Sequence, residues 1–224
     1  IAIQYLFSSI QINFIVGFLI LSMFLFNQSL VAEEWILNGS SAKTISYAFV
    51  ILSIALAMHK KYIYSFLCIG FAITLHVLVG FYSLICLLMG ILFTQGYKHF
   101  ITTLKRYSIF FIISGSWGFY IIFKNTVLQK IISSGDIISD VWKTYVIFRH
   151  PHHLYPPSWS NDYIIYLIIC SSIFAIAIKK LKIKYKLLSI FALSTECLFL
   201  LGLLLSYLGE IEYLRFHLFR VGDV

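Results

Sequence analysis

The chain has 224 residues, of which 60% are hydrophobic and 12% charged, with a formal net charge of +8 and a mean hydropathy of +0.91. Soluble domains carry roughly 25% charged residues, so this composition excludes a soluble globular protein and indicates an integral membrane protein. The Lys and Arg residues sit in short segments between apolar runs, where they record membrane orientation. We therefore expect the lipid bilayer as a partner and no nucleic acid.

Apolar runs predict where the chain crosses the membrane, because about 20 apolar residues span ~30 Å of hydrocarbon. The runs cover residues 5–26, 44–58, 62–93, 107–123, 163–178 and 187–208. The third run would make ~48 Å of helix, so we expect a break at His76 and Gly80 that yields two short crossings or a re-entrant hairpin. The predicted fold class is all-α, a polytopic transmembrane helical bundle of about six or seven spans. It forms one domain over residues 1–224, which we expect to be a fragment of a longer chain.

The distribution of charge predicts the orientation of these spans. Residues 179–186 contain five lysines and no acid, which is typical of a cytoplasmic loop. Counting crossings from this loop puts Lys60, Lys61 and residues 98–106 on the same side. The remaining loops, at residues 27–43, 124–162 and from 209 onward, hold eight of the nine acids. We therefore expect an inner (plasma) membrane protein whose long loop at 124–162 is extracytoplasmic.

The long loop contains the most unusual stretch of the sequence. Apolar residues recur at three- and four-residue spacing through residues 131–148, which predicts an amphipathic helix in the membrane interface. The sequence RHPHHLYPPSW follows, from Arg149 to Trp159. Pro151 should end the helix, and Pro156 with Pro157 should stiffen the exit, so the segment is predicted to be a rigid polar turn at the membrane surface.

The side chains of this turn suit a phosphate-bearing substrate. Arg149 offers a planar fork of donors, and His150 and His153 can donate hydrogen bonds, so these three are predicted to bind substrate. His152 is the candidate proton shuttle and catalytic histidine. Two alternatives stand beside this hypothesis: the cationic groups reach lipid headgroups and have no other role, or the histidines bind a metal. Their spacing matches no zinc pattern, so no metal ligand is assigned.

Paired acids mark the loop after the first span. Glu33 and Glu34 could act as general base on an acceptor hydroxyl, or hold a divalent cation, and both are candidate catalytic residues. The alternative is that they are solvated loop charges. The sequence requires no cofactor, and a divalent cation is the one cofactor that these acids leave open.

Further ionisable residues lie at or near membrane depth. His76 is either part of a substrate site or a helix-ending histidine bonded to backbone. Glu196 is in the middle of the last span, where a carboxylate requires protonation, a partner or a polar cavity. Arg215 and Arg220, near the end of the chain, could bind a substrate phosphate or pair with the neighbouring glutamates.

The order of these features resembles a known architecture. The segments LNGSSAKTISYAF, GFAITLHVLVGFYSLICLL, RHPHHLYPPSW and RFHLFRVGD together resemble polytopic bacterial membrane proteins of an uncharacterised family. Those proteins in turn are similar to C-fold (GT-C) glycosyltransferases. The resemblance implies transfer of a sugar from a lipid-linked, polyprenyl-phosphate donor on the extracytoplasmic face of the cell envelope. It also implies catalysis by an acid in the first outside loop, here Glu33 or Glu34, and donor phosphate near Arg149 and Arg220.

Two other hypotheses remain open from the sequence. One is an O-antigen polymerase or ligase acting on pyrophosphate-linked glycans, where outside Arg and His do the work and no acidic base is needed. The other is a non-enzymatic transporter or scaffold subunit, in which Glu196 and His76 would form a substrate or proton path.

Overall fold

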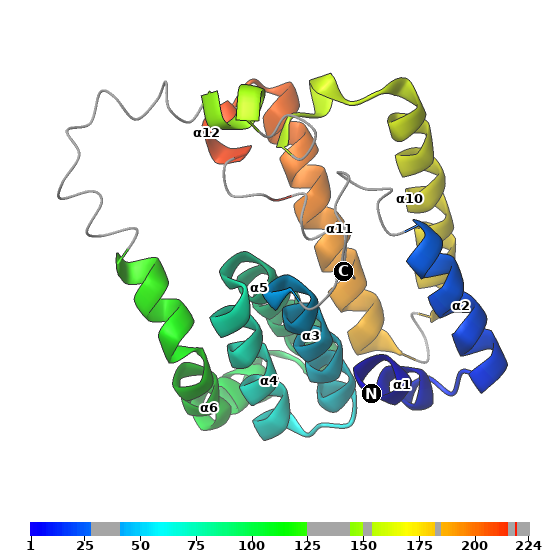
Figure 1. The fold of residues 1–224 in the computed structure, drawn as a ribbon. Coiled ribbons are helices and arrows are strands. Elements are labelled where there is room, and N and C mark those ends of the chain that lie inside the picture. Colours follow the sequence, from blue (N-terminus) through cyan, green and yellow to red (C-terminus); the bar gives the residue numbers. More distant parts are fainter. Residues whose placement is uncertain (28–40, 125–143, 150–153, 182–184, 215–217, 219–224) are drawn as a thin grey trace.

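The computed structural model describes residues 1–27, 41–124, 144–149, 154–181, 185–214 and 218 (Figure 1). Within these ranges the chain forms helices and no strands, which confirms the all-α prediction. The elements are α1 (Ala2–Ser9), α2 (Phe14–Asn27), α3 (Ala42–Met58), α4 (Tyr62–Leu75), α5 (Val77–Gln95), α6 (Tyr97–Phe123), η3 (Tyr145–Arg149), η4 (Pro156–Ser158), α10 (Asn161–Leu181), α11 (Lys186–Tyr207) and α12 (Ile211–Leu214).

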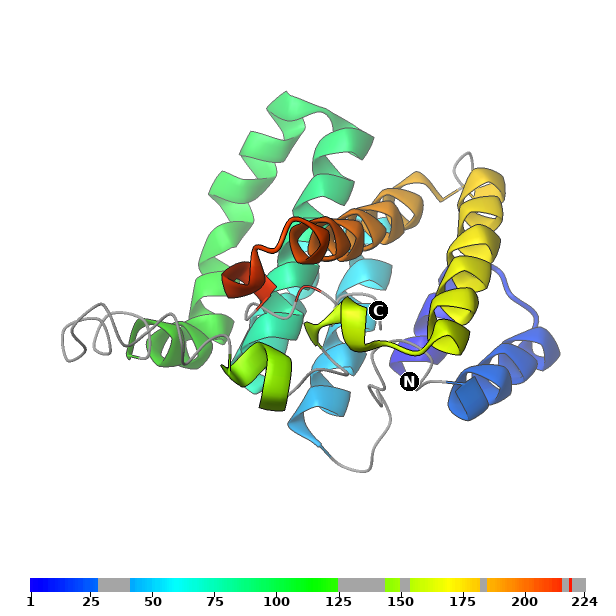
Figure 2. The same ribbon diagram turned by 90° about the horizontal axis from the view of Figure 1, so that it is seen from above.

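The helices gather in two groups on either side of α11. Helices α3 to α6 pack together on one side, and α11 lies against α5 (Figures 1 and 2). Helices α2 and α10 lie on the other side of α11. The short turns η3 and η4 and helix α12 collect near the C-terminal end of α11, so one end of the molecule carries the segments that flank the long loop.

In the part of the chain that the structure describes, three helices are long and apolar enough to cross a membrane: Val77–Gln95, Tyr97–Phe123 and Lys186–Tyr207. Shorter apolar helices cover Ala42–Met58, Tyr62–Leu75 and Ile164–Lys179. At ~1.5 Å per residue the 14 residues of α4 extend ~21 Å, less than a full hydrocarbon layer. The described residues therefore contain three candidate membrane spans, and a total of six or seven spans in the chain stays a prediction.

The first predicted span is divided. Helix α1 ends at Ser9 and α2 begins at Phe14, so the apolar run 5–26 is not one helix. Gln11 has a left-handed backbone with φ of 58°, and Asn13 Oδ1 accepts a hydrogen bond from the Ile15 N–H at 2.9 Å. The two polar residues inside the run thus supply a helix stop and the next helix start.

The predicted cytoplasmic loop at residues 98–106 is also helical, since α6 begins at Tyr97 and continues to Phe123. Its first turns are amphipathic: Lys98, Lys105 and Arg106 are exposed, whereas Thr103 is buried. Charge alone predicted a loop here, but a helix that emerges from the apolar layer can carry these cations on its outer face.

Helix α4 lies at the centre of the packed group α3 to α6, which we refer to as the bundle. Eight of its 14 residues are buried, and it packs against α3, α5 and α6. The break predicted in the third apolar run is confirmed: α4 ends at Leu75 and α5 begins at Val77, with His76 between them. The His76 Nδ1 accepts a hydrogen bond from the Val79 N–H at 3.3 Å, so this side chain caps the start of α5.

Serine hydroxyls join α3 to α4. Ser53 and Ser65 exchange hydrogen bonds in both directions, each hydroxyl donating to the other residue's carbonyl at 2.9 Å. One heptad earlier in α3 and later in α4, the Ser46 hydroxyl donates to the Ala72 carbonyl at 2.9 Å. All three serines are buried. Hydrogen bonds between helices replace the hydrophobic effect as an attraction where lipid surrounds the protein.

Small residues join α4 to α6. A Cβ at Gly70 would lie 2.7 Å from the Phe111 carbonyl oxygen and 2.9 Å from the Gly115 nitrogen, both backbone atoms. Gly118 lies similarly close to Ile73. The Thr74 hydroxyl donates to the Ser114 carbonyl at 2.8 Å across the same contact. The two backbones therefore approach each other as closely as in small-xxx-small pairs of membrane helices.

The opposite face of α6 is large and apolar. Ile109, Ile113, Trp117 and Tyr120 are each more than half exposed, while the buried residues of α6 are Thr103, Ser114, Gly115 and Gly118. A soluble helix would place these groups the other way round. Small residues inside and large apolar residues outside are the pattern of a helix that faces lipid.

We predict that Gly70→Ala destabilises the bundle by about 1–3 kcal/mol, because its methyl group must displace the backbone of α6. Gly90→Ala is the matched control: a Cβ there meets Leu187 at 3.4 Å, an ordinary contact. Thermal unfolding of the full chain in detergent should lower the Tm for Gly70→Ala and leave it nearly unchanged for Gly90→Ala. Equal Tm values for both variants would contradict the close α4–α6 contact.

Candidate functional site

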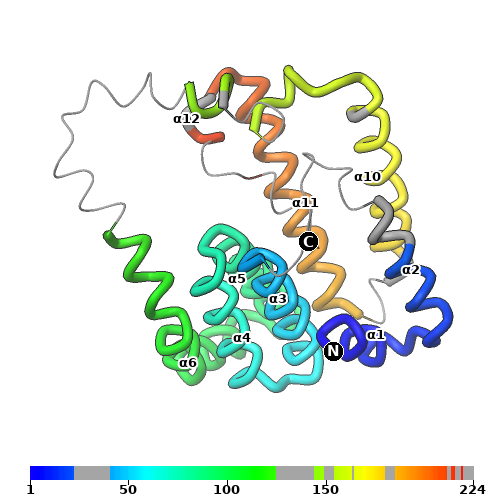
Figure 3. Tube along the Cα trace, in the orientation of Figure 1, coloured from blue at the N-terminus to red at the C-terminus, as the bar shows by residue number. Residues whose placement is uncertain are grey.

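The predicted turn that begins at Arg149 and contains the three histidines is called the Arg/His turn below. The segments before and after it meet in one buried cluster. Val146, Leu154, Phe199 and Leu214 are each no more than 2% exposed and pack together; we call them the loop cluster. Val146 lies in η3, Leu154 follows the histidines in the sequence, Phe199 lies in α11 and Leu214 lies in α12. Figure 3 shows η3, η4 and α12 beside the C-terminal end of α11. Two distant parts of the sequence, one with Val146 and Leu154 and the other with Phe199 and Leu214, are thus held at one end of the molecule.

The cluster fixes both sides of the turn. Val146 and Arg149 lie within one turn of η3, and Leu154 resumes the chain after the histidines. The exit is ordered by η4: the Ser158 hydroxyl donates to the Tyr155 carbonyl at 2.8 Å, and the Trp159 N–H donates to the Pro156 carbonyl at 3.0 Å. The predicted stiffening by Pro156 and Pro157 takes the form of this 3-10 turn.

Helix α12, which precedes the late arginines in the sequence, reaches the same cluster. Leu214, the last residue of α12, is fully buried there and directly precedes Arg215. The neighbours of Arg149 and of Arg215 therefore belong to one packed unit. The predicted site residues that lie outside the described residues are Glu33, Glu34, His150, His152, His153, Arg215 and Arg220. The amphipathic helix predicted over 131–148 also lies mostly outside them.

His76 has a structural task at the α4–α5 junction, where it caps α5 as described above. Its role in substrate binding stays a prediction. Among the described residues no group of three or more His, Cys, Asp or Glu side chains could hold a metal ion.

Glu196 has a partner that the sequence did not identify. The Ser171 hydroxyl of α10 donates to Glu196 Oε1 of α11 at 3.0 Å, and both residues are half-buried. Because α10 otherwise touches α11 sparingly, this hydrogen bond is a specific link between the two helices. A serine in an apolar helix gives no sequence signal of its partner, since the pairing depends on how the helices pack.

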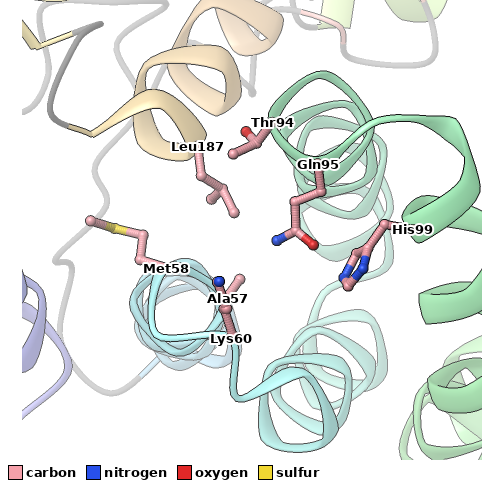
Figure 4. A pocket seen from close by; sticks show the side chains of 7 residues that line it. All are labelled: Ala57, Met58, Lys60, Thr94, Gln95, His99 and Leu187. Atoms are coloured by element: carbon pink, nitrogen blue, oxygen red, sulfur yellow. The ribbon is translucent and has the colours of Figure 1, made fainter.

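A pocket that the sequence did not predict lies at the end of the bundle opposite the loop cluster. A cavity of about 360 Å³ is lined by Ala57, Met58, Lys60, Thr94, Gln95, His99 and Leu187 (Figure 4). The ends of α3 and α5 and the beginnings of α6 and α11 converge there. The charge distribution predicts that Lys60 and Lys61, residues 98–106 and residues 179–186 lie on one side of the membrane, and the position of this pocket is consistent with that. Which side faces the cytoplasm stays a prediction.

Comparison with known proteins adds no assignment: no protein-family model matches the sequence, and neither the curated proteins nor the solved structures contain a significant match. The candidate site therefore depends on the residues and contacts of this chain alone.

We predict a measurable coupling between Ser171 and Glu196. In a double-mutant cycle with Ser171→Ala and Glu196→Ala, the interaction energy should be about 0.6 kcal/mol, the average for hydrogen bonds between membrane helices, and no more than about 1.7 kcal/mol. The free energy of unfolding in mixed micelles is the measurement. Ser172→Ala serves as control, because the Ser172 hydroxyl donates to the Ile168 carbonyl of its own helix at 2.7 Å. A coupling no larger with Ser171 than with Ser172 would refute the link.

Proposed function

We propose that this chain is a membrane glycosyltransferase-like protein that transfers a sugar from a polyprenyl-phosphate donor at the end of the molecule marked by the loop cluster. The observation that carries the proposal is the shared burial of Val146, Leu154 and Leu214. This packing ties the backbone next to Arg149 to the backbone next to Arg215. Two guanidinium groups attached to one packed unit can bind one phosphate from two sides.

In the proposed mechanism the acceptor hydroxyl attacks the anomeric carbon of the sugar. Glu33 or Glu34 takes the hydroxyl proton, the new glycosidic bond forms, and the bond from the anomeric carbon to the phosphate oxygen breaks. Negative charge grows on the leaving polyprenyl phosphate. Arg149 and the adjacent histidines stabilise that charge, which is the role that fixed donors perform best in a site shielded from water.

Arg149→Ala is expected to lower the transfer rate about 10²–10³-fold and His152→Ala about 10²–10⁴-fold, as for the loss of an electrostatic stabiliser and a proton shuttle. The measurement is transfer of a radiolabelled sugar from synthetic polyprenyl-phosphate sugar by the purified full chain in proteoliposomes. Lys186→Ala, at the opposite end of the bundle, is the control and should retain activity.

Leu154→Ala tests whether sugar transfer depends on the packing of the loop cluster. This side chain is fully buried in the loop cluster, so its truncation should reduce transfer, whereas Leu193→Ala, at a half-exposed position of α11, should not. Full activity of both the Arg149 and His152 variants would remove the case for this turn.

A second candidate function is transport, which the Ser171–Glu196 hydrogen bond favours. A carboxylate in the interior of an apolar helix, bonded to a hydroxyl of the next helix, is typical of a substrate or proton path. In this case Glu196 rather than the turn would carry the function.

Substitution of the acids distinguishes the three hypotheses. Glu33→Gln or Glu34→Gln should lower sugar transfer about 10²–10⁴-fold if one of them is the general base. A polymerase or ligase should be indifferent to both substitutions but sensitive to Arg149→Ala. A transporter should lose substrate uptake into proteoliposomes with Glu196→Gln and keep it with Arg149→Ala. The same four variants in both assays yield three distinct patterns of loss.

A further inference from the structure

The pocket at the basic end has the composition of a binding site. Its volume of about 360 Å³ lies within the usual range of small-ligand sites. Met58 and Leu187 line one side of it and Gln95 and His99 the opposite side, with Ala57 and Lys60 together between them (Figure 4). Gln95 is held in place, because its side-chain amide donates to the Tyr62 hydroxyl. The side with Gln95 and His99 is thus partly ordered before any ligand arrives.

The charge of the pocket selects an anion. Lys60 and His99 lie in its lining, and the lining includes no acid. The sequence strengthens this point, because residues 41–123 and 163–195 contain no Asp or Glu at all. The helices that form the pocket therefore have no carboxylate near this end that could neutralise Lys60. A ligand with a phosphate group would supply the missing negative charge.

The backbone at Lys60 is unusual for a lysine. The Lys60 N–H donates to the Ala57 carbonyl and the Lys61 N–H to the Leu56 carbonyl, both at 2.9 Å, which is a Schellman motif at the end of α3. Lys60 takes its left-handed position, with φ of 59°. The same motif after α11 has glycine there, Gly209, with φ of 77°. Gln11 takes the same left-handed position after α1, and glycine suits this position at least as well, so Lys60→Gly removes the ammonium group without straining the backbone.

We propose that this pocket binds a phosphate group through Lys60 and His99, and that the group belongs to an anionic lipid of the adjacent leaflet. The location favours a lipid over a soluble phosphate. The pocket lies where α3 and α5 end and α6 and α11 begin, which is headgroup depth if these helices cross the bilayer. Met58 and Leu187 then offer apolar contact to the first methylenes of an acyl chain.

The test uses the full chain purified in a non-ionic detergent and analysed by native mass spectrometry. One arm titrates phosphatidylglycerol, a second titrates phosphatidylcholine with the same acyl chains, and a third measures inorganic phosphate by isothermal titration calorimetry. We expect preferential retention of phosphatidylglycerol. Lys60→Gly should weaken phosphatidylglycerol binding about fivefold, the effect of one cation at an anionic surface. Adding His99→Gln to that variant should weaken the binding further.

Lys61→Gly is the matched control, since this lysine is adjacent but does not line the pocket, and it should leave binding unchanged. Because glycine suits the left-handed position, Lys60→Gly should keep or raise the Tm, so a loss of binding there is not a loss of fold. Binding of inorganic phosphate with equal retention of both lipids would support the site and assign it a soluble phosphate. Equal losses for Lys60→Gly and Lys61→Gly, or no binding in any arm, would overturn the proposal.

Discussion

The architecture depends on how closely the backbone of α4 approaches its neighbours. Gly70 against α6 and the Ser53–Ser65 pair against α3 leave no room for larger side chains, so the short helix is enclosed on both sides. Large apolar groups are then displaced to the outer faces, where a bilayer can solvate them. A bundle built in this way needs few charges inside and places its charged residues at the ends of its helices.

The two ends of the molecule consequently differ in chemistry. One end gathers the flanks of the Arg/His turn around Phe199 of α11, and the other gathers Lys60 and His99 around Leu187 of the same helix. Helix α11 contacts the loop cluster through Phe199, in its C-terminal half, and the pocket through Leu187, near its N-terminus. The proposed site for a lipid-linked substrate and the proposed site for a membrane lipid thus share one helix without sharing a residue.

The sequence predicted the elements whose signal is local. The break at His76 and the all-α fold follow from run length and apolar periodicity, and both are confirmed. The division of the first run was missed because Gln11 and Asn13 are only two polar residues in an apolar stretch, yet they provide a stop and a cap. The Ser171–Glu196 bond and the pocket at Lys60 arise from contacts between distant helices, which no local pattern encodes. The turn at Arg149 was predicted from its composition, and the packing of its flanks came from the structure.

Leu214 and Leu218 lie in two different buried clusters. Leu214 belongs to the loop cluster, and Leu218 is only 7% exposed and packs in the core formed by α3, α4, α5 and α11. Two residues only four positions apart in the sequence thus contact two separate buried clusters. The loop cluster and the core of α3, α4, α5 and α11 are therefore connected twice, through α11 and through these two leucines.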